Sequence, residues 1–91
     1  MSGRDGSEFL QKLRRELLSQ LAEADLEFCR LRMRVEQMES DIRVGEAESP
    51  EYQEAKGHEL PQAEGRVLTL FRELGKIEDR IRAIRRREAA E

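Results

Sequence analysis

The chain has 91 residues, 17 of them Lys or Arg and 20 Asp or Glu, so its formal charge is −3 and 41% of it is charged. Ala, Glu, Lys, Leu and Arg make up 52 residues, a bias that is typical of long helices and coiled coils when prolines and aromatic residues are few. This length allows one domain, the near-neutral charge argues against a nucleic-acid binder, and no apolar run approaches the roughly 18 residues of a membrane span.

Targeting signals and reactive groups are equally sparse. Residues 1–9 lack the apolar core of a signal peptide, so we expect a cytoplasmic protein without a membrane partner. A single cysteine, Cys29, excludes an internal disulfide framework and a cysteine-based zinc site. The chain has one histidine, no triad-like pairing of it with a serine or cysteine, and no Gly-rich phosphate loop. We therefore expect no enzymatic activity, no catalytic residue and no cofactor.

The first predicted helix spans residues 7–44 and follows a tail at residues 1–6 that we expect to be disordered. Ser7 can act as its N-cap, and Gly45 can supply the left-handed conformation at its end. Its apolar residues recur in alternating steps of four and three over four heptads, the repeat that packs helices as a left-handed coiled coil. This stripe consists of Leu17, Leu21, Ala24, Phe28, Leu31, Val35, Met38 and Ile42.

The second predicted helix spans residues 50–88, after an acidic loop at residues 45–49. Ser49 is its expected N-cap and Pro50 its first residue, where the missing N–H costs nothing. Gly57 and Pro61 indicate either a kink or a short break near residues 57–61, because a proline inside a helix removes a hydrogen bond and clashes with the preceding turn. The stripe of this helix consists of Leu60, Ala63, Val67, Leu70, Leu74, Ile77, Ile81 and Ile84.

Two heptad helices joined by a short loop predict an all-α fold, an antiparallel two-helix coiled-coil hairpin. Near the loop the expected core is thin, with Met38 and Ile42 facing Tyr52. Away from the loop, additional apolar residues lie off the stripes, and a contiguous apolar patch normally marks an interface. These interface candidates are Leu13, Leu18, Leu68 and Phe71. We expect them to join two copies into a homodimer with a four-helix bundle; the alternative is a monomer with an exposed apolar end.

The loop forms an acidic tip made of Glu46, Glu48, Glu51 and Tyr52. Clustered carboxylates at a solvated tip usually form a hydrophilic cap. The alternative is a weak metal site at Glu46 and Glu51, since Mg²⁺ binds through one or two carboxylates and keeps its waters.

Residues 45–56, GEAESPEYQEAK, and residues 64–67, EGRV, resemble parts of the N-terminal coiled coil of Gre-type transcript-cleavage factors. The resemblance implies a coiled coil that enters the secondary channel of bacterial RNA polymerase, where the tip acids help to bind a catalytic Mg²⁺. This chain departs from that pattern: its tip is one residue shorter, and Glu46 stands in place of an aspartate.

Three functions remain open at this level. The first is a non-enzymatic coiled-coil adaptor that self-associates and binds a partner protein. The second is a polymerase-channel factor that uses its acidic tip in transcription regulation. The third is a small helical secretion or assembly chaperone, which shares the same architecture.

Overall fold

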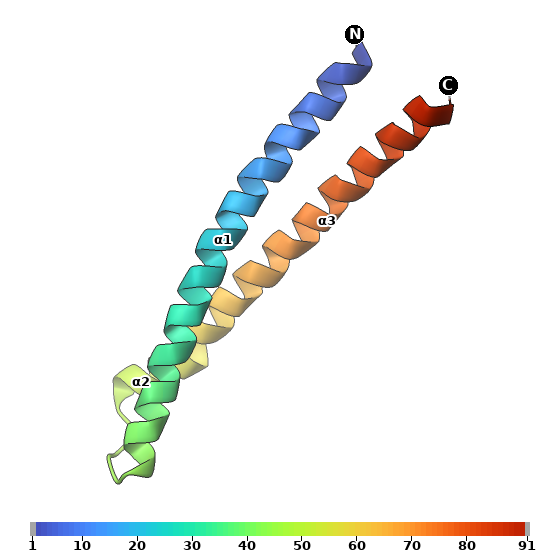
Figure 1. Cartoon of the computed structure of the whole chain (residues 1–91). Helices are drawn as coiled ribbons and strands as arrows, with labels where there is room; N and C mark the ends of the chain where they lie inside the picture. The colour runs from blue at the N-terminus through green and yellow to red at the C-terminus, as the bar shows by residue number, and fades with distance from the viewer. Residues whose placement is uncertain (1, 91) are drawn as a thin grey trace.

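The computed structural model describes residues 2–90, with side chains for residues 7–90, and every element in this range is helical. Helix α1 spans Ser2–Arg43. After a short loop the chain continues through α2 (Pro50–Glu54), the π-helical segment η1 (Ala55–Glu59) and α3 (Leu60–Ala90). These three segments form one continuous arm that returns along α1, so both ends of the described chain lie at the same end of the hairpin, where the arms diverge (Figure 1). The result is a helical hairpin with extents of 68 × 17 × 15 Å. We call the loop end the tip and the opposite end the open end.

The two predicted heptad stripes form the contact between the arms. Every residue of both stripes is buried or half-buried. At the open end, Leu10 packs with Ile77 and Ile81. Burial of large apolar side chains contributes about 1.5–3 kcal/mol each, so this seam supplies the main stabilising term of the hairpin. The prediction of an all-helical fold is confirmed.

The core near the tip is thicker than the sequence suggested. Val35 is 3% exposed, Tyr52 8% and Ala55 2%, and together they form a second buried cluster. Met38, Ile42 and Leu60 pack against it. The expected contact of Met38 and Ile42 with Tyr52 is therefore present, but it belongs to a closed core because the tyrosine ring fills the space between the arms.

Helix α1 begins earlier than the sequence predicted. It starts at Ser2, so Ser7 lies inside the helix, and residues 2–6 continue the helix where we expected a disordered tail. Once a helix exists, each further residue adds one backbone hydrogen bond, which allows the first turn to extend beyond a capping residue. Met1, the remaining residue of that tail, lies outside the described residues.

The end of α1 is closed by a Schellman motif. Gly45 has a φ of +109°, and its N–H donates to the carbonyl of Ile42 over 3.1 Å. The N–H of Glu46 donates to the carbonyl of Asp41 over 3.2 Å. These two bonds satisfy carbonyls that a helix end otherwise leaves free, and they require the backbone conformation that glycine adopts without strain.

The start of the returning arm follows the predicted capping pattern. Ser49 has extended backbone angles, and its hydroxyl accepts a 3.1 Å hydrogen bond from the N–H of Tyr52. Pro50 occupies the first helical turn, and Glu51 lies in the same turn, where a carboxylate interacts favourably with the helix dipole. The loop is therefore short because both of its ends are fixed locally.

The irregularity before Pro61 is a π turn. No residue between Pro50 and Ala90 leaves the helix, so there is no break. The N–H of Leu60 donates to the carbonyl of Ala55, five residues earlier. A regular α-helix would bring the Pro61 ring against the Gly57 carbonyl and leave that carbonyl without a donor, whereas a π turn adds one residue at this point.

The spacing of the apolar residues also indicates one additional residue before Pro61. Ala55 lies three residues after Tyr52, but Leu60 lies five residues after Ala55, one more than a heptad step. The additional residue of η1 absorbs this excess, so Leu60 packs against the cluster that contains Tyr52 and Ala55. The π turn keeps the seam in register on both sides of Pro61.

Candidate functional site

Two ion pairs between the arms mark the two sides of the hairpin. On one side, Lys56 Nζ lies 2.6 Å from Glu39 Oε2; on the other, Arg66 Nη1 lies 3.6 Å from Glu27 Oε2. Glu39 directly follows a seam residue and Glu27 directly precedes one, and these two heptad positions flank opposite edges of a coiled-coil seam. We call these edges the Glu39 side and the Glu27 side.

Three of the four interface candidates lie on the Glu39 side. Leu18 precedes Glu39 by three heptads. Phe71 follows Lys56 by two heptads and the additional residue of the π turn, and Leu68 lies one helical turn before Phe71. Leu18 is 37% exposed, Leu68 50% and Phe71 61%. These three residues, which we call the apolar side, present large side chains that the hairpin leaves in contact with water.

Leu13, the fourth candidate, lies elsewhere. It precedes Glu27 by two heptads and therefore belongs to the Glu27 side. Its side chain is half-buried and packs against the cluster of Leu10, Ile77 and Ile81. Leu13 thus stabilises the hairpin itself, because the neighbouring helix covers it.

The outer face of α1 carries apolar residues that the sequence analysis did not select. Leu26 is 52% exposed and Met33 is 67% exposed. With Leu18, Ala22 and Cys29 they follow steps of four, four, three and four residues, a second stripe about a third of a turn away from the seam. That spacing could have identified these exposed residues from the sequence. It was not recognised because the seam stripe has nearly the same period.

The predicted acidic tip separates into an exposed and a buried part. Glu46, Glu48 and Glu51 are exposed, as expected for a solvated cap. Tyr52 is not part of that surface, since its ring is buried and its hydroxyl donates a 3.0 Å hydrogen bond to Glu39 Oε2. Among the described residues, no three Asp, Glu, His or Cys side chains come together as a potential metal site.

A polar network closes the seam beside the tip. The Lys56 ammonium donates to Glu39 Oε2 over 2.6 Å and to the Tyr52 hydroxyl over 3.1 Å. The hydrogen bonds from Lys56 and Tyr52 lower the pKa of Glu39, and the hydrogen bond to Glu39 raises the pKa of Lys56. Both side chains are therefore charged at neutral pH, and together they fix the position of Tyr52.

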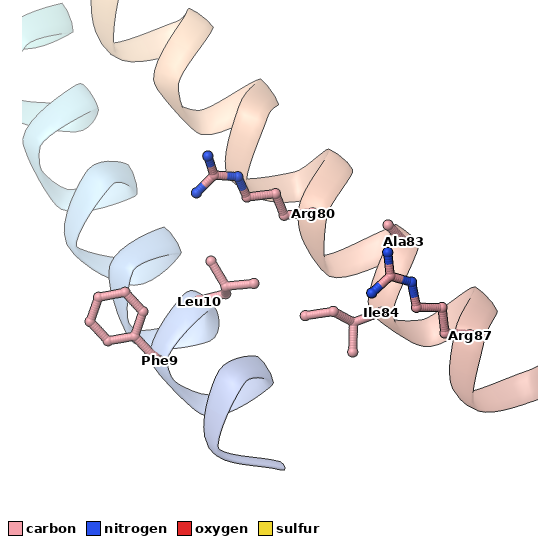
Figure 2. Close-up of a pocket in the computed structure, with 6 residues that line it drawn as sticks. All are labelled: Phe9, Leu10, Arg80, Ala83, Ile84 and Arg87. Carbon is pink, nitrogen blue, oxygen red and sulfur yellow. The ribbon is translucent and has the colours of Figure 1, made fainter. Parts of the chain in front are cut away.

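An apolar groove lies at the open end, where the arms diverge (Figure 1). It has a volume of about 410 Å³. Leu10 of α1 faces Ile84 of α3 across it, the side chains of Arg80 and Arg87 border it, and Phe9 lines its edge with the ring turned away from α3 (Figure 2). Arg80 follows Arg66 by two heptads, so this groove opens on the Glu27 side, away from the apolar side.

Comparisons with known proteins identify no relative of this chain. No family model, no curated protein and no solved structure matches this chain. Within residues 2–90, none of the helices has both the length and the apolar character needed to cross a membrane.

Proposed function

We propose that the protein is a non-enzymatic helical-hairpin interaction module that self-associates through its apolar side and binds a partner protein. The observation that carries this proposal is the position of Leu18, Leu68 and Phe71, which come from both arms yet lie on one side of the seam, at 37%, 50% and 61% exposure. A coiled-coil pair that only had to hold itself together would carry polar residues at these flanking positions.

The small size of the hairpin supports the same proposal. Two helices enclose a single seam, and a chain of this length buries little apolar surface relative to the conformational entropy that it loses. Pairing the apolar sides of two copies would produce a four-helix arrangement, in which Leu18 and Phe71 leave water. Dimer formation would thereby stabilise the fold of each hairpin as well as join the two copies.

Sedimentation equilibrium of the wild type and of Phe71→Asp tests this proposal. Each copy contributes Phe71 to a symmetric interface, and loss of about 1.5–3 kcal/mol per buried side chain should weaken the dimer by at least about 100-fold. Phe9→Asp is the matched control, because Phe9 is 66% exposed but borders the groove on the Glu27 side. A wild-type mass of 10.6 kDa at all concentrations would exclude self-association.

A second candidate function is the polymerase-channel factor. The feature that favours it is the placement of Glu46, Glu48 and Glu51 as exposed carboxylates at one end of a rod 68 Å long. A pull-down with core RNA polymerase, followed by a cleavage assay on backtracked complexes, separates it from the adaptor. Glu46→Ala combined with Glu51→Ala should abolish cleavage under this hypothesis, and absence of polymerase binding would exclude it.

A further inference from the structure

Charge is distributed unevenly along the rod. Residues 36–60, which form the tip third, contain eight carboxylates and two cationic side chains. Residues 7–16 and 78–90, which form the open third, contain eight cationic side chains and five carboxylates. The two ends of one copy therefore have opposite charge, and each end is complementary to the other end of a second copy.

The apolar side lies between these ends. At 1.5 Å per residue, Leu18 is about 24 Å from the start of α1 and about 38 Å from its end at Arg43. Phe71 is about 29 Å from the end of α3 at Ala90. Contact through this surface therefore joins two rods near the middle of their length. Contact through the apolar side is compatible with two symmetric dimers, one with the rods parallel and one with the rods antiparallel.

Charged residues on the Glu39 side discriminate between the two arrangements. Arg82 and Arg85 lie two heptads beyond Leu68 and Phe71, about 21 Å toward the open end on the same side, and Glu78 lies between Phe71 and these arginines. Arg82 also forms a 3.2 Å ion pair with Asp79, at 65% side-chain exposure, and can still meet an additional carboxylate.

Toward the tip, the same side carries carboxylates together with Arg32, one heptad before Glu39, and Arg43. Glu64 lies one heptad before Phe71. Glu36 lies about 27 Å beyond Leu18, where its carboxylate is 4.0 Å from Arg32. Glu48 borders the same surface hollow as Glu39, which places it on this side too.

From these positions we infer that the second copy binds antiparallel, with the tip of each hairpin against the arginines of the other. A two-fold axis across the rods, through the apolar side, brings Arg82 and Arg85 of one copy opposite the Glu36 and Glu64 region of its partner. The parallel arrangement would place eight carboxylates beside eight others, and juxtaposed like charges strongly disfavour association. This inference rests on the proposed self-association. It also implies that any partner that binds the tip competes with the dimer.

Distances between labelled copies test the orientation in the full-length chain. In a Cys29→Ser background, a nitroxide at Ser40→Cys reports the separation of equivalent sites by pulsed electron resonance. Ser40 is exposed and lies about 18 residues from the level of the proposed axis, so the antiparallel dimer should give about 50 Å and the parallel dimer less than about 30 Å. A short distance would overturn this inference and leave self-association intact. Absence of a dimer in sedimentation would overturn both.

Charge reversal gives an independent readout. Arg82→Glu with Arg85→Glu should weaken the dimer at least about tenfold, because each rod then meets its partner's acidic end with like charge. Adding Glu36→Arg and Glu64→Arg to the same chain restores complementarity in the antiparallel dimer and should recover most of the affinity. If the combined variant stays as weak as the first, the antiparallel contact is wrong. Circular dichroism of each variant confirms that the hairpin is still helical.

Discussion

The hydroxyl of Tyr52 donates a 3.0 Å hydrogen bond to Glu39, which joins the first turn of the returning arm to α1 thirteen residues earlier in the chain. The ring beneath this hydroxyl is 8% exposed and packs with Val35 and Ala55. One side chain therefore links the buried cluster near the tip to the charged network above it. This double role explains why the tip end has a closed core although its heptad stripe is poor.

Removing that hydroxyl should destabilise the hairpin by a small, measurable amount. Tyr52→Phe keeps the ring in the cluster but deletes the hydrogen bond to Glu39 and the one from Lys56, and a bond of this kind contributes about 0.5–1.5 kcal/mol to the free energy of unfolding. Urea unfolding followed by circular dichroism measures the difference. An unchanged midpoint would show that water replaces the hydroxyl at no cost.

The lowered pKa of Glu39 makes part of the stability depend on acid pH. Hydrogen bonds from Lys56 and Tyr52 hold this pKa below its ordinary value of 4.5. A carboxylate of this kind contributes its stabilisation above the unfolded-state pKa, and the contribution is lost as the pH falls through the lower folded-state pKa. The difference in free energy of unfolding between the wild type and Glu39→Gln should therefore be constant near neutral pH and shrink below about pH 4.5.

The control for this titration is Glu73→Gln. Glu73 has its partner, Lys76, on the same helix at 3.3 Å, so its neutralisation removes no contact between the arms. We expect a smaller effect, in line with the low value of exposed ion pairs within one helix. A Glu39→Gln difference that keeps its neutral-pH size down to about pH 3 would contradict the role of the carboxylate charge.

Two glycines should respond to alanine in opposite directions. Gly57 has a helical environment with open space where a Cβ would lie, so Gly57→Ala should stabilise the hairpin by about 0.4–1 kcal/mol. Gly45 has a φ of +109°, and Gly45→Ala should destabilise it by more than that amount, because an L side chain is strained there. Thermal unfolding of both variants measures the contrast. Equal effects would mean that the tip does not hold the Schellman geometry.

The heptad steps alone predicted much of the fold. Every residue that they selected is buried or half-buried in the seam, and the signals at Ser49, Pro50 and Gly45 located the loop. The π turn was missed because Gly57 and Pro61 were interpreted through their intrinsic helix-breaking tendency. The five-residue step from Ala55 to Leu60 was the signal that packing, rather than propensity, determines the backbone there.

The exposure of the four interface candidates was predicted in part. Leu18, Leu68 and Phe71 are exposed as expected, but Leu13 is covered by the other arm. An off-stripe residue is exposed or covered depending on which edge of the seam it flanks and on how far the arms diverge at that level. The edge that a residue flanks can be derived from its heptad position. The divergence of the arms depends on side-chain packing, which the heptad pattern does not contain.

Amide exchange should locate the most dynamic segment at the loop alone. The sequence pattern predicted a thin core near the loop, but Ala55 is 2% exposed within a closed cluster. We therefore expect fast exchange at residues 47 and 48, which have no regular structure, and slow exchange at Val35 and Ala55. Tyr52→Ala, which empties the cluster, should extend fast exchange through η1. If residues 50–60 exchange as fast as the loop in the wild type, the tip orders only on contact with a partner, and the buried cluster does not hold the two arms together.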